Sequence, residues 1–106
     1  MSDTWTLIAN PTAGGGHGCS IAERATLALQ DAGQAIELRY TREQGHATEL
    51  AREAVAAGVH RLIVCGGDGT ISEVLPALAG SSTALGLLPF GTANDLARAL
   101  AIPRKI

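Results

Sequence analysis

The sequence has little charge and no long hydrophobic run, and each of these shortages excludes a class of protein. Of its 106 residues, 17% are charged, and the formal net charge is −2 at pH 7. Without a basic surface, the chain is not expected to bind nucleic acid or to dock strongly on anionic membranes through charge. Its uninterrupted apolar runs are too short to span a bilayer.

Cysteine is also scarce, and its spacing is not that of a metal site. Cys19 lies in a glycine-rich stretch and Cys65 at the end of an apolar run, and together they match no zinc pattern. The N-terminus does not resemble a secretory signal, so we expect a cytoplasmic protein whose thiols stay reduced. A length of 106 residues corresponds to one domain.

Two well-known phosphate-binding patterns are missing as well. No G-x-x-x-x-G-K-S/T occurs, and the G-x-G-x-x-G register that starts at Gly67 meets Ser72 in place of its last glycine. A different glycine turn, 66–70, follows the apolar run 61–65, which is rich in β-branched residues. This order predicts a strand, a glycine turn and a helix.

The turn 66–70 has the chemistry of a phosphate site. Thr70 and Glu73 match a capping box, so the helix is predicted to start at Thr70. The glycines leave bare backbone N–H groups at the mouth of that helix, whose dipole favours anions. Asp68 would repel a bare phosphate, and a carboxylate in this position therefore indicates a nucleotide bound together with Mg²⁺.

Hydrophobic spacing predicts further strands and helices. The strands are expected at 5–9, 35–40 and 84–88. The alternation in 35–40 is typical of a strand towards the edge of a sheet, whereas 84–88 is apolar throughout and is predicted to be buried on both faces. The helices are expected from a capping box at Ser20 to a stop at Gly33, from Ala47 to a stop at Gly58, and from Leu96 to Leu100.

This order of elements predicts a three-layer α/β/α fold, Rossmann-like, with a parallel sheet and right-handed crossovers. The glycine-rich and polar stretches all follow strands, at 10–18, 41–46, 66–70 and 91–95. The carboxyl ends of parallel strands share one edge of the sheet, where open α/β sheets bind their ligands. Four loops are therefore expected to converge on one binding site.

Three stretches in a fixed order give the sequence a family resemblance. They are Asn10-Pro11-x-Ala13-Gly14, Gly66-Gly67-Asp68-Gly69-Thr70 and Pro89-Phe90-Gly91-Thr92-Ala93-Asn94-Asp95-Leu96-Ala97. With them the sequence resembles the nucleotide-binding half of the diacylglycerol kinase catalytic family, which includes bacterial lipid kinases and has sphingosine kinases as relatives. The Gly-Gly-Asp-Gly turn alone is shared with NAD kinases and phosphofructokinases, and the stretch 91–95 favours the lipid-kinase branch. An NAD kinase-type or sugar kinase domain, and a non-catalytic nucleotide-binding regulatory module, are the alternatives.

The resemblance implies the N-terminal domain of the NAD kinase/diacylglycerol kinase-like fold and transfer of the γ-phosphoryl of ATP to a lipid hydroxyl. Diacylglycerol or a related lipid would be the acceptor, and Mg²⁺ the metal. Asp68 and Asp95 would be the catalytic residues that organise the metal and the phosphates. The residues implied to contact the nucleotide are Asn10, Thr41, Gly66, Gly67, Asp68, Gly69, Thr70, Glu73, Gly91, Thr92 and Asn94.

The chain departs from the family at two residues and at its end. Relatives usually carry Asn in place of Ser72 and Asp in place of His46, and we expect the histidines of this chain to be solvated. Family members continue past Pro103 into a β-rich domain that contributes much of the lipid site. Residues 1–106 are therefore expected to be a domain truncated before that part and inactive alone, cytoplasmic or peripheral at a membrane. An apolar patch near the site or along an edge strand is expected to let it self-associate.

Overall fold

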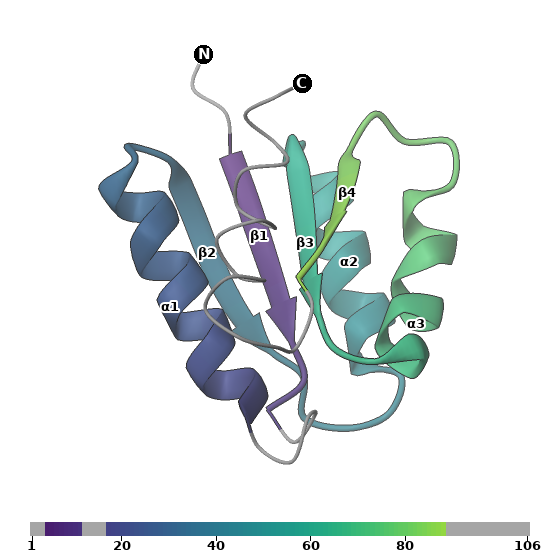
Figure 1. Ribbon diagram of the computed structural model, residues 1–106. Helices are drawn as coiled ribbons and strands as arrows, with labels where there is room; N and C mark the ends of the chain where they lie inside the picture. The colour runs from purple at the N-terminus through teal and green to yellow at the C-terminus, as the bar shows by residue number, and fades with distance from the viewer. Residues whose placement is uncertain (1–3, 12–16, 89–106) are drawn as a thin grey trace.

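A computed structural model describes residues 4–11 and 17–88 of the chain (Figure 1). Their elements are β1 (Thr4–Ala9), α1 (His17–Asp31), β2 (Ala35–Tyr40), α2 (His46–Ala56), β3 (Arg61–Cys65), α3 (Asp68–Leu78) and β4 (Ala84–Leu87). The four strands form one parallel sheet in the order β2-β1-β3-β4. The predicted α/β architecture with a parallel sheet is thereby confirmed. The helix predicted at 96–100 lies outside the described residues.

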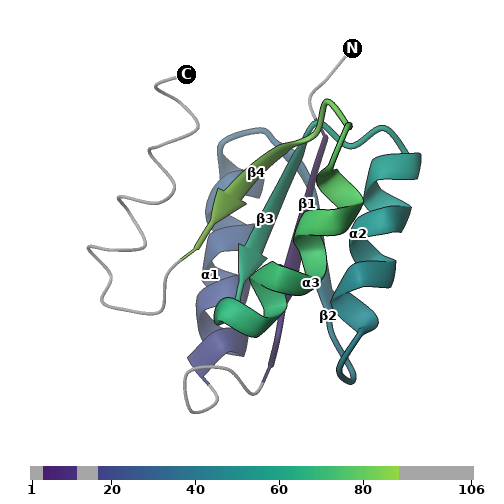
Figure 2. The same ribbon diagram turned by 90° about the vertical axis from the view of Figure 1, so that its right-hand side faces the viewer.

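The sheet separates two helical layers. α1 covers one face, and α2 and α3 lie side by side on the other (Figure 2). Successive side chains of a strand point to opposite faces, so β1 contributes to two cores. Leu7 and Ala9 pack with α1, whereas Ile8 packs with α2 and α3. The described helices include none that is both long and apolar enough to cross a membrane.

The predicted helix stops are confirmed, and they depend on glycine. Gly33 and Gly58 follow α1 and α2 with φ of 86° and 78°, a backbone region that side chains with a Cβ rarely adopt. Each of the two turns therefore needs a residue without a Cβ. The strands β2 and β3 begin soon after, which places both crossovers as the sequence predicts.

Two of the predicted helix starts are wrong. α1 begins at His17 instead of Ser20, and α3 begins at Asp68 instead of Thr70. Gly67, in an extended conformation, is the N-cap of α3, and no side chain caps this helix. Thr70 instead lies in the first turn and is buried against the chain that enters the helix. Thr70 and Glu73 therefore have the spacing of a capping box, but both lie inside α3 and do not mark its start.

The burial predicted for the fourth strand is also wrong. β4 lies at the edge of the sheet next to β3, and Leu85 and Leu87 are 36% and 51% exposed. Only Leu88, just after the strand, is buried among the described residues of this segment. An apolar sequence predicts burial on both faces for a central strand, but here the sheet order leaves the strand on the outside. The edge position predicted for 35–40 is confirmed, because β2 forms the opposite edge.

Candidate functional site

Three of the predicted site loops meet at one edge of the sheet, as Figure 1 shows at the arrowheads of β1, β2 and β3. The Asn10 N–H donates to the Cys65 carbonyl at 3.1 Å, and the Thr41 N–H donates to the Ala9 carbonyl at 2.9 Å. These two bonds tie the ends of the three strands together. We call this edge, with Asn10, Thr41 and Gly66 as its first residues, the carboxyl rim.

The order of the strands reverses between β1 and β3: β2 lies on one side of β1, and β3 and β4 lie on the other. β1 and β3 are neighbours, but the helices that follow them cover opposite faces (Figure 2). The chains leaving these two strands therefore diverge. In open parallel sheets this is the position at which ligands bind.

The glycines of the turn after β3 have different surroundings. A Cβ built on Gly66 would lie 2.8 Å from the Thr70 Cβ, which is closer than real side chains approach. Gly66 therefore allows the strand end to pack directly on the first turn of α3. Gly67 and Gly69 are exposed, and none of the described residues lies within 4 Å of a Cβ added to either of them. This side of the turn is accessible to a ligand.

The first turn of α3 presents backbone donors at the rim. The first four N–H groups of a helix have no partner within the helix, and no side chain caps α3. The Ile71 N–H makes the first bond of the helix, to the Gly67 carbonyl at 3.1 Å. The preceding amides lie beside the two open glycines, at the positive end of the helix dipole. This arrangement suits a phosphate group.

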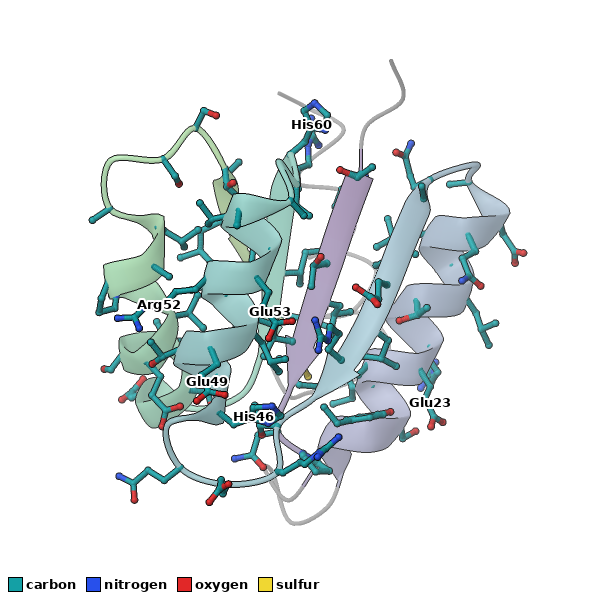
Figure 3. All side chains as sticks on the ribbon, turned by 180° about the vertical axis from the view of Figure 1, so that it is seen from behind. Glu23, His46, Glu49, Arg52, Glu53 and His60 are labelled. Carbon is teal, nitrogen blue, oxygen red and sulfur yellow. The ribbon has the colours of Figure 1, made fainter. Side chains whose placement is uncertain are left out.

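The exposed charged side chains around the rim are mainly acidic. In the β2–α2 loop and in the first turns of α2 and α3 they are Arg42, Glu43, Glu49 and Asp68. Figure 3 shows Glu49 on α2 near this edge. A bare polyanion would meet net negative charge here, whereas a phosphate group that carries a divalent cation would not.

The described residues contain no group of three or more side chains placed to hold a metal ion. Asp68 is exposed and opens α3, so a single carboxylate is available beside the first-turn amides. Mg²⁺ commonly keeps several waters and takes its remaining ligands from one or two carboxylates and the substrate phosphates. The donors at this rim fit Mg²⁺ bound in that way.

Glu73 lies one turn further along α3 and is half-buried. Its carbonyl accepts a hydrogen bond from the Thr48 hydroxyl at 2.7 Å, which connects α3 to α2. The bond fixes the relative position of the two helices that begin at the rim. The predicted site residues Gly91, Thr92, Asn94 and Asp95 lie outside the described residues.

The hydrogen bond of His46 at the rim was not predicted from the sequence. The residue is half-buried, less exposed than expected, and its Nδ1 accepts a hydrogen bond from the Arg42 N–H at 2.9 Å. His60 is exposed as expected, at the other end of the sheet (Figure 3). The side chain of His17 lies outside the described residues. A polar side chain six residues after the end of β2 and next to Gly45 was the available signal.

Comparison with known proteins identifies the family. The model of the diacylglycerol kinase catalytic domain matches residues 4–106. The chain belongs to this family. The predicted family is thereby confirmed, and so is the diacylglycerol kinase-like fold.

Relatives of this diacylglycerol kinase family chain occur in several bacteria. A protein of Cronobacter sakazakii named "Probable lipid kinase YegS-like" is 50% identical over 82 residues, which cover 74% of this chain and 27% of that protein. A Serratia proteamaculans protein of the same name is 46% identical over 94 residues, 85% of this chain and 31% of the relative. The solved structure of a diacylglycerol kinase from Bacillus anthracis has a TM-score of 0.76 at 26% identity, over 99% of this chain and 44% of that one.

These matches cover only a part of each relative. The chain spans about a quarter to a third of the length of the curated relatives, 27% and 31%. What the family comparison shows for this chain is a match to the diacylglycerol kinase catalytic domain.

Proposed function

We propose that this chain is the ATP-binding domain of a lipid kinase, which transfers the γ-phosphoryl of ATP to the hydroxyl of diacylglycerol or a related lipid. The observation that carries the proposal is the uncapped first turn of α3, with open glycines beside it and Asp68 as its first residue. Family membership supports the choice of a lipid kinase over an NAD kinase or a sugar kinase.

Within this proposal, the amides of the first turn of α3 bind the phosphates, and Gly67 and Gly69 let them approach. Asn10 and Thr41 contact the nucleotide from the ends of β1 and β2. Phosphoryl transfer needs positioning and charge neutralisation more than covalent chemistry, and bound Mg²⁺ supplies the neutralising charge. Asp68 and Asp95 hold the metal together with the phosphates. The residues proposed to complete the nucleotide site are Gly66, Thr70, Glu73, Gly91, Thr92 and Asn94.

The acceptor side of the proposal rests on the family alone. We propose that the lipid is held largely by a further β-rich domain, that the 106 residues are inactive without it, and that the protein is cytoplasmic with peripheral contact to the membrane.

Calorimetric titration with ATP tests the proposal directly. We expect saturable binding that requires Mg²⁺ and that NAD does not displace. Asp68→Ala is expected to weaken Mg-ATP binding at least about tenfold, since it removes a charged ligand, and to leave the folded state intact because the side chain is exposed. Glu43→Ala is the matched control, because it removes an exposed carboxylate from the neighbouring loop.

Tight binding of NAD in preference to ATP would favour an NAD kinase-type domain. Mg-ATP binding that Asp68→Ala leaves unchanged would contradict the role given to this carboxylate. Binding of ATP with no phosphorylation of any lipid by a chain that carries the β-rich domain would favour a regulatory module.

A further inference from the structure

The β2–α2 loop is held in place by the ring of His46. The chain leaves β2 at Thr41 and reaches the first residue of α2 five positions later. His46 then turns back over this loop, and its Nδ1 accepts the Arg42 N–H at 2.9 Å. The hydrogen bond thus joins His46, the first residue of α2, to Arg42, the second residue of the loop.

Three other features define the same loop. The Thr41 N–H donates to the Ala9 carbonyl at 2.9 Å, and the His46 N–H donates to the Glu43 carbonyl at 3.1 Å. Gly45 has a φ of 90°, which reverses the chain just before α2. The backbone of Thr41 is therefore anchored to β1 on one side, and the next peptide is anchored to the imidazole on the other.

The hydrogen bond requires one tautomer of the ring. A ring nitrogen that accepts a hydrogen bond carries no proton on that atom, so the bond needs the tautomer of His46 with its proton on Nε2. An Asn or Asp at this position would place an Oδ at the same number of bonds from Cβ as Nδ1. Either side chain could accept the same N–H.

We propose that His46 is a positioning residue for nucleotide binding: its Nδ1 fixes the Arg42 peptide and thereby the orientation of Thr41 at the carboxyl rim. The inference rests on the proposed function for the contact between Thr41 and the nucleotide. The hydrogen bond itself does not depend on that function.

His60 provides a matched control within the chain. Its Nδ1 also accepts a backbone N–H, that of Thr4, at 3.2 Å. This bond lies at the amino end of the sheet, opposite the carboxyl rim (Figure 3). Removing it eliminates the same kind of interaction without touching the proposed site.

The test compares His46→Leu, His46→Asn and His60→Leu. Calorimetry with Mg-ATP should show a Kd about three- to tenfold higher for His46→Leu, the range expected for one lost hydrogen bond. His46→Asn and His60→Leu should bind as the unchanged chain does. In ¹⁵N NMR spectra, the unchanged chain should show an unprotonated Nδ1 on His46. The Arg42 amide proton resonance should shift in His46→Leu and stay in His46→Asn.

Each outcome decides one part of the inference. Mg-ATP binding by His46→Leu at the original affinity would overturn the positioning role and leave the proposed function intact. A protonated Nδ1 on His46, or an Arg42 amide proton resonance that does not shift in His46→Leu, would contradict the hydrogen bond that closes the loop. Absence of Mg-ATP binding in the unchanged chain would contradict the proposed function and the nucleotide role of His46, while the NMR result would still decide whether the ring fixes the loop.

Discussion

Gly66 and Gly69 stand three residues apart in the same turn, and their surroundings predict opposite effects of a methyl group. In Gly66→Ala, the Cβ would meet Thr70 at 2.8 Å, so the strand end and α3 must move apart. We expect a loss of about 1–3 kcal/mol in the free energy of unfolding, the range typical of overpacking. Urea denaturation followed by circular dichroism measures it.

Gly69→Ala is the matched comparison. No atom of the residues that the structure describes lies within 4 Å of the added methyl group, and alanine favours a helix over glycine by up to about 1 kcal/mol. The variant should therefore be as stable as the unchanged chain or more so. Its methyl group would occupy the open side of the phosphate turn, so we expect weaker Mg-ATP binding. Equal stability losses in both variants would contradict the different roles assigned to the two glycines.

At the scale of elements, α2 and α3 are joined by one side-chain bond near the rim. Thr48→Val removes the hydroxyl that donates to the Glu73 carbonyl at 2.7 Å and leaves the shape of the side chain almost unchanged. We expect a loss of about 1 kcal/mol in unfolding free energy, the usual worth of such a bond. Thermal and urea unfolding would measure it.

Thr26→Val is the control for that substitution. The Thr26 hydroxyl also donates to a carbonyl, but the acceptor is Ala22 in the same helix. A hydrogen bond from a side chain to a carbonyl one turn earlier in the same helix does not join two elements and adds little to helix stability. If Thr26→Val lowered the free energy of unfolding as much as Thr48→Val, the hydrogen bond between α2 and α3 would contribute no more to stability than a bond within one helix.

Element boundaries were harder to predict than element types, for physical reasons that particular residues illustrate. Apolar spacing predicts each described strand and helix, because burial of one face dominates their stability. The start of α3 depends instead on the backbone of Gly67, which no side-chain pattern reports. The exposure of Leu87 depends on which strand lies at the edge of the sheet, and contacts between distant segments of the chain determine this.

The candidate site also has features that the sequence predicts and features that it does not. The glycine turn, the strand ends and their convergence follow from the sequence, because strands in a parallel sheet end at one edge. The contact between His46 and Arg42 could not be foreseen, since it depends on the direction of one ring. The packing of Gly66 on Thr70 likewise depends on the angle between β3 and α3.

At the scale of the whole molecule, the edge strand β4 is open to other chains. Leu85 and Leu87 are exposed on β4, which has no further partner among the described strands, and such edges favour strand pairing between molecules. We expect the 106-residue chain to self-associate at high concentration. Leu87→Lys should reduce the mass measured by light scattering, because it places a charge on the edge.

Leu27→Lys is the control for this prediction. Leu27 is 61% exposed, but it lies on the helix α1 and not on an edge strand. The substitution should leave the degree of association unchanged. A monomer at every concentration in the unchanged chain, or an equal effect of both lysines, would contradict association through β4.

The pairing of β1 with β3 also has a consequence for the order of folding. Thr4 and His60 lie 56 positions apart in the sequence, yet they are bonded across this pair. Contacts of such high separation require a long loop to close and are slow to form. The unit of β1, α1 and β2 can assemble during synthesis well before β3 emerges. The bond from Asn10 to Cys65 can form only after the third strand joins, so we expect the carboxyl rim to be among the last parts of the chain to become native.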